Sequence, residues 1–392
     1  MNKKIISLLA AVVVSLPLCA QSELERVLES VEQNNLSLRA EAYAVEGRTY
    51  EARMGNSLEP LSASYSTVGE SAGEIGAEGE LEVSQAFDMP WLYAARSRMA
   101  ETRAKQYETE YLALRQQILL EAKEVYLELC VLHELSALNK PRLAAAEHMA
   151  ELFATRYDTG DATLVDKNRT EFEYLLLREQ LSAVDLRIIE LKSRLADLNG
   201  GTEPECTYMM PPADVPMPLD RLLADWEEYA PDLTVLRLEQ QSADNDVKVS
   251  RRQAWPKVEV GYKYEYGDGR NKNGLTAGLS IPIFSNRHNV KRAKAMEYAA
   301  RTSAEAALAE QRNTVTELYM RTDYIGRMLG SFSTMPDAAS YTDMLGRLLE
   351  AGQINIVDYY SELDTFFSTL ETRMQTDLEY RIGLARLLVI YM

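Results

Sequence analysis

The stretch VEVGYKYEYGDGRNKNGLTAGLSIPIF, from Val258 to Phe284, decides the fold. Apolar and polar residues alternate on both sides of a turn rich in glycine and asparagine, which predicts two antiparallel strands joined as a hairpin. Each strand has about ten residues, a length that crosses a lipid bilayer at a tilt. One face of the hairpin would then contact lipid, and we expect this face to carry Val258, Val260, Tyr262, Tyr264, Leu275, Leu279 and Ile281.

The opposite face of the hairpin is charged, with Lys257, Glu259, Lys263 and Glu265 in its first strand. Two interpretations are open at this point. The hairpin is part of a barrel wall whose charged face lines the interior, or it belongs to an ordinary half-buried sheet packed on helices. The flanking sequence favours the barrel wall, because it consists of long helical segments that offer no globular core for the strands to cover.

The hairpin quoted above lies at about residues 256–284. A second, weaker copy of it lies at about residues 60–88. Pro60 and Pro256 precede the two copies, and VSQAF and LSIPI are found at the same distance from these prolines. The later segments YDTGDATLVD and LEAGQINIVD each place a glycine six residues before an aspartate. Matches that keep their order over the whole chain indicate a tandem repeat.

Both repeats predict the same order of elements: a short helix, a strand hairpin, a very long helix, a glycine turn and a return helix. We expect the first repeat at 21–198, a linker rich in proline and glycine at 199–218, and the second repeat at 219–392. The helices are expected at 22–55, 91–157 and 164–198, and again at 219–254, 289–350 and 356–391. The longest would be a rod of about 100 Å, which Pro141 and Pro336 should kink or break.

The first twenty residues resemble an export signal rather than a part of the fold. Lys3 and Lys4 precede an apolar run that is too short to span about 30 Å of hydrocarbon. Cleavage before Gln21 is expected, and lipidation at Cys19 is an alternative. The formal net charge of −18 argues against a nucleic-acid partner, because no basic patch is present to neutralise phosphates.

Two hairpins supply four strands, which cannot close a barrel, and open edges in lipid leave backbone groups without partners. The chain is therefore expected to pool its strands with copies of itself. Two copies give an eight-stranded barrel filled by side chains, and three give a twelve-stranded barrel with room for water. The charged inner face favours the larger number. The predicted fold is mainly α with β, in which long helical hairpins form an α-barrel below a trimeric twelve-stranded β-barrel.

The whole chain after the signal resembles the TolC-like outer-membrane efflux proteins of Gram-negative bacteria. The resemblance rests on the tandem repeat, on the two glycine-to-aspartate turns, and on the strand endings VSQAFDMPW and LSIPIFSNR that lead into long helices. Membership implies a homotrimer in the outer membrane whose helical part lies in the periplasm. It also implies docking to a periplasmic adaptor, a membrane-fusion protein, and to an inner-membrane pump of the resistance-nodulation-division type.

The resemblance also assigns roles to the two turns. It places Asp358, and Asp166 in the first repeat, at a constriction that closes the periplasmic end, although the family pattern is broken at Ser361 and Ile354. The alternative is that these aspartates only cap or solvate a helix end. The residues expected to contact the adaptor are Thr159, Gly160, Asp161 and Thr163 in the first turn, and Ala351, Gly352, Gln353 and Asn355 in the second.

No catalytic, cofactor-binding or metal-binding residues are predicted, because the sequence contains no nucleophile elbow, phosphate loop or cysteine–histidine cluster with zinc spacing. The function expected is a passive exit duct of a tripartite efflux pump, for drugs or metal ions. A different class of function is also open: a periplasmic coiled-coil scaffold or adhesin whose hairpins form a small sheet outside any membrane.

Overall fold

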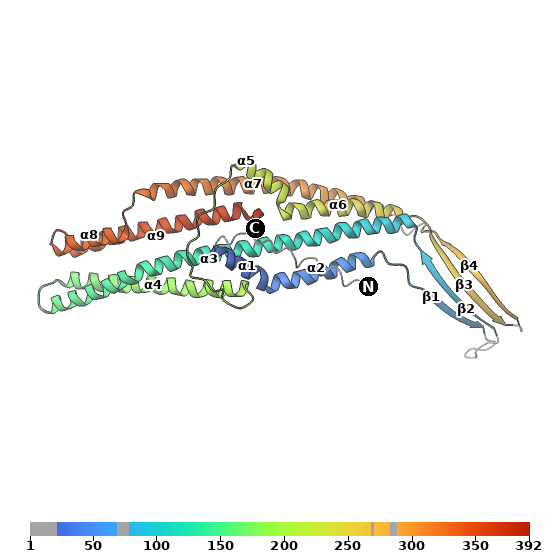
Figure 1. Ribbon diagram of the computed structural model, residues 1–392, viewed down its shortest axis with the longest axis horizontal. Coiled ribbons are helices and arrows are strands. Elements are labelled where there is room, and N and C mark those ends of the chain that lie inside the picture. Colours follow the sequence, from blue (N-terminus) through green and yellow to red (C-terminus); the bar gives the residue numbers. More distant parts are fainter. Residues whose placement is uncertain (1–21, 69–77, 268–269, 283–287) are drawn as a thin grey trace, which may run out of the picture. The chain divides into compact units, whose positions relative to one another are not determined.

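The computed structural model describes residues 22–68, 78–267, 270–282 and 288–392 (Figure 1). The expected signal peptide, with Cys19, lies outside the described residues, and so do residues 283–284 at the end of the second hairpin. The described chain forms two compact units, and each draws on both repeats. Unit 1 comprises residues 22–35, 119–215 and 325–385, and unit 2 comprises the described residues of 36–118, 216–324 and 386–392.

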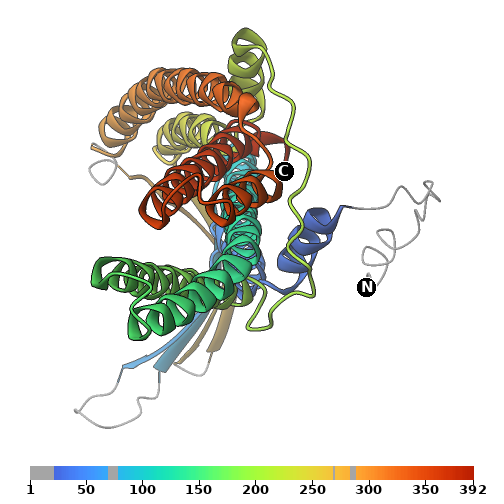
Figure 2. The same cartoon turned by 90° about the vertical axis from the view of Figure 1, so that its left-hand side faces the viewer.

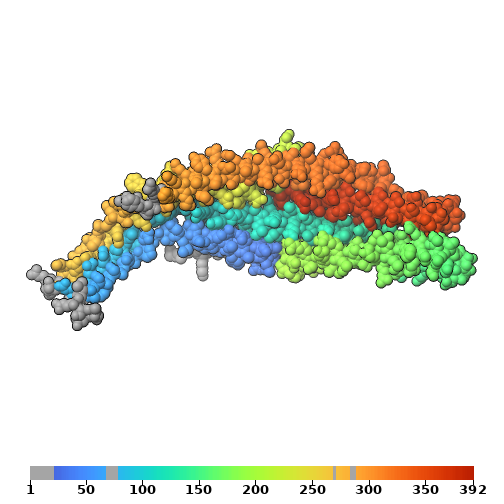
Figure 3. All heavy atoms as spheres, turned by 180° about the vertical axis from the view of Figure 1, so that it is seen from behind, coloured from blue at the N-terminus to red at the C-terminus, as the bar shows by residue number. Residues whose placement is uncertain are grey.

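Unit 2 contains one antiparallel sheet of four strands in the order β1-β2-β3-β4. The strands are β1 (Ser62–Val68), β2 (Glu78–Phe87), β3 (Lys257–Gly267) and β4 (Arg270–Ser280). The two hairpins join where β2 of the first repeat pairs with β3 of the second, with Val83 opposite Tyr262. The strands lie beyond the ends of the helices of this unit, and one face of the sheet is in plain view in Figure 3.

The short helix that opens each repeat is two helices, so the prediction of a single one is wrong. In the first repeat, α1 (Glu23–Asn34) and α2 (Leu36–Met54) are separated by Asn35, whose backbone is extended. In the second, α5 (Leu219–Tyr229) and α6 (Pro231–Arg252) are separated by Ala230, also extended. Pro231 explains the second break, since a proline disfavours the helical conformation of the residue before it.

Two helical hairpins make up most of unit 1, and Figures 1 and 2 show the partners of each hairpin side by side. The second half of α3 (Pro90–Asp158) pairs with α4 (Leu164–Leu198), and α8 (Ala338–Glu350) pairs with α9 (Ile356–Leu387). The side chains of Ile118, Val125 and Leu129 on α3 are buried, as their spacing along one helix face predicts. Among the described helices, none has the length and the hydropathy needed to cross a membrane.

The two prolines expected to interrupt the long helices behave differently. Pro141 lies inside α3, which continues through it, so of the predicted kink or break the break is absent. At Pro336 the chain leaves the helix: α7 (Asn289–Ser331) and a short 3-10 turn, η1 (Phe332–Thr334), end before it, and α8 starts afresh. Asp337 favours the restart, because its carboxylate accepts a hydrogen bond from the Ser340 amide at 3.1 Å and caps α8. A second 3-10 turn, η2 (Val389–Tyr391), follows α9.

The linker between the repeats is bound to unit 1 along its first part. The Glu23 carboxylate accepts hydrogen bonds from the amides of Thr207 and Tyr208, at 2.6 and 2.8 Å, and from the Tyr126 hydroxyl at 3.2 Å. The Tyr208 ring stacks on His133 of α3, with 4.7 Å between ring centroids. These contacts hold the linker against α1 and α3, so this connection is part of the folded unit.

Candidate functional site

One face of the sheet is apolar across all four strands. Directly paired residues share a face, and the register places Ala63, Val83, Tyr262 and Leu275 in one row across it. Tyr262 is 47 % exposed, Leu275 85 % and Leu279 68 %, so the described helices of unit 2 leave these side chains uncovered. That exposure contradicts the interpretation as a half-buried sheet packed on the protein's own helices.

The other face of the sheet is polar and internally paired. Lys263 forms ion pairs with Glu80 and Glu265, each at 2.9 Å. The Ser84 hydroxyl donates a hydrogen bond to Glu259 at 2.7 Å. Charged and hydroxyl groups that satisfy one another in this way are suited to a wet surface, so the two faces are matched to two different surroundings.

The residues expected to face lipid all lie on the apolar face. Val258, Val260, Tyr262 and Tyr264 alternate along β3, Leu275 and Leu279 lie opposite them on β4, and Ile281 follows directly after β4 with the same parity. Within the part of the chain that the structure describes, β1 and β4 each pair with one strand only, so both edges of the sheet carry unpaired backbone groups. A sheet with an apolar face and two open edges is incomplete as a single chain.

The two glycine turns of unit 1 have the same backbone geometry. Gly160 and Gly352 have positive φ values of 82° and 65°, which favour glycine over residues with a side chain. The Asp161 amide donates to the Arg156 carbonyl at 2.7 Å, and the Gln353 amide donates to the Leu348 carbonyl at 2.9 Å. Both are the six-to-one hydrogen bond of the Schellman motif, which ends a helix and reverses the chain.

The helices that leave the turns are capped differently, and this separates the two candidate aspartates. Thr163 caps α4, and the Asp166 carboxylate accepts hydrogen bonds from the Thr163 amide at 3.0 Å and hydroxyl at 2.7 Å. Asn355 caps α9 by accepting a hydrogen bond from the Asp358 amide at 2.8 Å. The Asp358 carboxylate itself is exposed and makes no hydrogen bond or ion pair within the described residues. Asp166 therefore takes part in the cap of α4, Asp358 is available for other interactions, and the place of both at a constriction stays a prediction.

A cluster of aromatic and aliphatic side chains supports the second turn from behind. It joins α3, α8 and α9, and its buried members are Phe153, Leu345, Ile356, Tyr360, Leu363, Phe366 and Phe367. Ile354 packs against this cluster. The cluster fixes the α8–α9 turn on the end of the α3–α4 hairpin, so the positions of the two turns depend on each other.

Sequence reasoning missed a group of exposed apolar residues beside the turns. Leu164 and Val165 begin α4, Val357 lies in the first turn of α9, and all three are exposed. The signal was present in the repeated LVD and IVD tripeptides, which carry apolar residues where a solvated helix start would have polar ones. Exposed apolar side chains grouped at the end of a hairpin indicate a contact surface.

The long helices, paired turns and four-stranded sheet form a fold that solved structures of bacterial outer-membrane channels share. A membrane protein from Pseudomonas aeruginosa matches with a TM-score of 0.80 at 17 % identity, over 95 % of this chain and 94 % of that one. The outer-membrane channel CmeC of Campylobacter jejuni matches with a TM-score of 0.78 at 14 % identity, over 94 % of this chain and 85 % of that one.

The outer membrane protein VceC of Vibrio cholerae matches with a TM-score of 0.73 at 18 % identity, over 94 % of this chain and 95 % of that one. No protein-family model matches the chain, and no curated protein matches it. The likeness is therefore one of fold, found at identities of 14–18 %.

Proposed function

We propose that the chain is a subunit of an outer-membrane channel of the TolC-like family, a passive exit duct from the periplasm to the exterior. The observation that carries this proposal is the apolar face of the sheet, whose row Ala63, Val83, Tyr262 and Leu275 includes the exposed side chains of Tyr262 and Leu275. In water this face would be an aggregation hazard. In a bilayer it is the outer wall of a barrel, and the polar face with Lys263 lines the inside.

Closure of that barrel requires further copies of the chain. Four strands per chain leave two open edges, and unpaired backbone groups cost several kcal/mol each in lipid. Three copies would supply twelve strands, which is wide enough for an aqueous interior. The fold shared with the outer-membrane channels supports a homotrimer of this kind.

Exposed apolar stripes on the helices support the same self-association. On α2 the exposed residues Leu36, Tyr43 and Tyr50 recur at intervals of seven. On α4 the exposed residues Phe172 and Leu186 lie fourteen apart, as do Leu175 and Ile189. The seven-residue spacing on α2 is that of a helix face covered by a second helix, and neighbouring copies in a tube of helices would provide one.

The turns are the proposed periplasmic end of the duct. An adaptor of the membrane-fusion type would dock on the two turns and the adjoining Leu164, Val165 and Val357, and an inner-membrane pump of the resistance-nodulation-division type would supply the energy. The cargo would be drugs or metal ions. Asp358, with its uncommitted carboxylate, would form the constriction, since like charges brought together on a narrow axis repel one another and favour opening or cation binding.

Fractionation of cells that express the full chain tests the proposal. The mature protein is expected in the outer membrane, released only by detergent, as an oligomer whose electrophoretic migration changes on heating. The result that would overturn the duct is a mature chain recovered from the periplasm without detergent and monomeric in solution, which would favour the scaffold or adhesin.

A further inference from the structure

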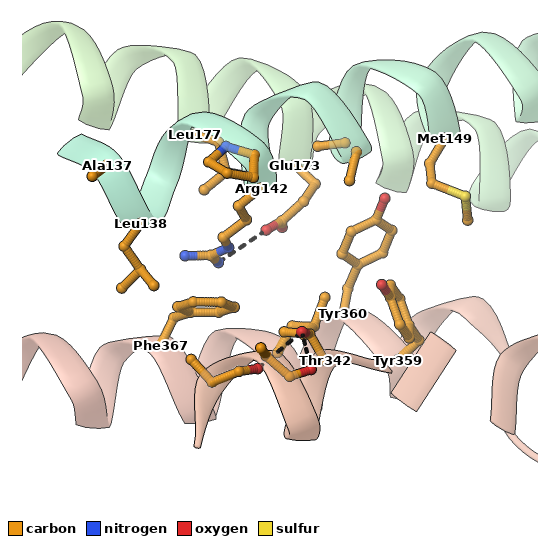
Figure 4. Close-up of a pocket in the computed structure, with 16 residues that line it drawn as sticks. Ala137, Leu138, Arg142, Met149, Glu173, Leu177, Thr342, Tyr359, Tyr360 and Phe367 are labelled. Carbon is orange, nitrogen blue, oxygen red and sulfur yellow. Dashed lines mark hydrogen bonds and ion pairs between the residues drawn. The ribbon is translucent and has the colours of Figure 1, made fainter. Parts of the chain in front are cut away.

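Unit 1 contains a cavity of about 360 Å³ that the channel role leaves unexplained. It lies between the α3–α4 hairpin and the α8–α9 hairpin, and its walls come from all four helices (Figure 4). Most of the lining is apolar, with Leu138, Met149, Leu177 and Leu363 among the larger side chains. A largely apolar cavity of this size with a few polar groups is typical of a site for a small organic molecule.

The polar groups of the cavity centre on Arg142 and Glu173. Both side chains are buried, 9 % and 5 % exposed, and the shortest distance between guanidinium and carboxylate is 3.6 Å. A charge-assisted hydrogen bond is about 2.7–2.9 Å long, so this pair is an ion pair without a good hydrogen bond. The Phe367 ring lies under the guanidinium at 4.2 Å from its centroid and holds it in place, as Figure 4 shows.

Two hydrogen-bond donors in the wall of the cavity have no partner within the described residues. Nε of Arg142 and the Tyr360 hydroxyl are buried and have no partner within the described residues. Tyr360 is 3 % exposed, and burial raises the pKa of its hydroxyl, which stays protonated and can donate. A buried polar group without a partner is destabilising, so a ligand that accepts hydrogen bonds from these two donors would remove that cost.

The unsatisfied groups favour an acceptor over a cation. Arg142 already occupies the face of Phe367, so a cationic ligand would meet a like charge at that ring. Burial lowers the pKa of Arg142, while Glu173, Glu371 and Asp364 oppose that shift. Burial raises the pKa of Glu173, against the opposing effect of Arg142 and Arg169. The case for an acceptor is geometric, because the 3.6 Å contact with Glu173 is too long for a good hydrogen bond and Nε of Arg142 has no partner within the described residues.

We propose that the cavity binds a small aromatic carboxylate, whose carboxylate accepts hydrogen bonds from Arg142 and Tyr360 and whose ring packs against the apolar wall. A bound ligand touches both helical hairpins and lies beside Tyr359, the neighbour of Asp358. The inference concerns binding within unit 1 and stands apart from the proposed function.

Three probes of one shape test the proposal on the purified mature full-length protein in detergent: 2-naphthoate, 2-naphthamide and 2-naphthylmethylammonium, which differ in the charge of the head group. Calorimetric titration is expected to show one saturable site per chain for naphthoate. Its affinity should exceed that of the amide by about 10-fold or more, the equivalent of one charge-assisted hydrogen bond. The cation should bind more weakly than both.

Two neighbouring alanines provide a matched pair of variants. Ala145 and Ala144 are neighbours on α3 and both are exposed, but Ala145 lines the cavity and Ala144 does not. Ala145→Leu should weaken naphthoate binding at least about 10-fold, the loss expected when one side chain overlaps the ligand by a methylene group or more, and Ala144→Leu should leave it unchanged. Arg142→Lys should reduce the preference for naphthoate over naphthamide, because lysine lacks the planar fork of donors.

Thermal unfolding of each variant separates loss of the site from loss of the fold. The proposal is overturned if the wild-type protein shows no saturable naphthoate binding, if the three probes bind equally, or if the cation binds most tightly. Equal affinities of the two alanine variants would also overturn it, because the probe would then bind outside the cavity. Since the titration measures binding alone, its outcome is distinct from that of the membrane fractionation.

Discussion

A charge placed on the apolar face of the sheet should prevent membrane assembly, and Leu275→Arg is the sharpest such change. Leu275 lies midway along β4, opposite Tyr262, and is 85 % exposed in the single chain. The free energy of burying an arginine at the midplane of an outer-membrane barrel is about +2–4 kcal/mol. In a trimer the cost is incurred three times, about 6–12 kcal/mol, which is comparable with the whole stability of a typical domain.

The neighbouring residue provides the control. Thr276 lies on the polar face of the same strand, where its hydroxyl is 3.4 Å from the Glu82 carboxylate. An arginine at position 276 would meet that carboxylate in a wet environment, and its effect should stay within about 1 kcal/mol. The two variants carry the same new charge at adjacent positions, so the only difference between them is the face of the sheet.

The assay compares the amount of heat-modifiable oligomer in the outer-membrane fraction for the wild type, Leu275→Arg and Thr276→Arg at matched expression. Leu275→Arg should lose most of the oligomer, and Thr276→Arg should retain it. If Leu275→Arg assembles normally while Thr276→Arg fails, the apolar face does not contact lipid and the proposed barrel is wrong.

Three further predictions concern unit 1. Asp166→Ala should lower the free energy of unfolding by about 1 kcal/mol, because the reciprocal cap with Thr163 is lost. Asp358→Ala should lower the free energy of unfolding by less, and it should change the single-channel conductance in planar bilayers. If Asp358→Ala destabilises the protein more than Asp166→Ala in thermal unfolding, the assignment of the cap is wrong. Burial lowers the pKa of His133 in the folded protein, so the unfolded chain binds the proton more tightly than the folded chain does. The free energy of unfolding should therefore fall as the pH drops below about 6.5, by at most about 1.4 kcal/mol per pH unit. Thermal unfolding between pH 8 and 5 should show a flatter profile for His133→Phe than for the wild type, and parallel profiles would refute the linkage. Phe366→Ala removes a ring that stacks on Tyr341, with 4.6 Å between the ring centroids, and should lower the free energy of unfolding by about 3–5 kcal/mol. The loss should appear as faster amide hydrogen exchange in α8 and α9. Unchanged exchange in these helices would mean that the cluster does not hold the second turn.

The faces of the sheet could be predicted from sequence because side-chain direction in a strand strictly alternates. A register error of one residue would have moved Val260 and Tyr262 to the polar face, and the observed pairing of Tyr262 with Leu275 agrees with the alternation. The return helix 164–198 was likewise predicted to the residue, since Gly160 and Thr163 are strong signals for the end of one helix and the start of the next.

The helix breaks could be predicted only in part. The extended Ala230 follows from the local effect of Pro231, a signal that the sequence contained. Asn35 is different, because its side chain donates a hydrogen bond to the Leu198 carbonyl at 2.8 Å. That partner lies 163 residues away, and no local pattern around Asn35 distinguishes it from a residue inside a continuous helix.

The two aspartates show why a repeat in the sequence does not imply a repeat in chemistry. Asp166 and Asp358 are equivalent in register, and both turns have the same backbone hydrogen bonds. The cap residues differ, however: the Thr163 hydroxyl and amide both donate to Asp166, whereas Asn355 only accepts from the Asp358 amide. A single change of cap thus engages one carboxylate and leaves the other uncommitted.

The cavity around Arg142 lay beyond sequence reasoning for a related reason. A helical pattern predicts which face of a helix is apolar, but a charged residue such as Arg142 is assigned to the solvent on that basis. Its burial depends on Glu173 of α4 and Phe367 of α9, which reach it from helices distant in sequence. An ion pair buried at a distance of 3.6 Å with unsatisfied donors is a poor source of stability. A binding site accounts better for such a pair than stability does, because a ligand can supply the acceptor that the protein itself does not.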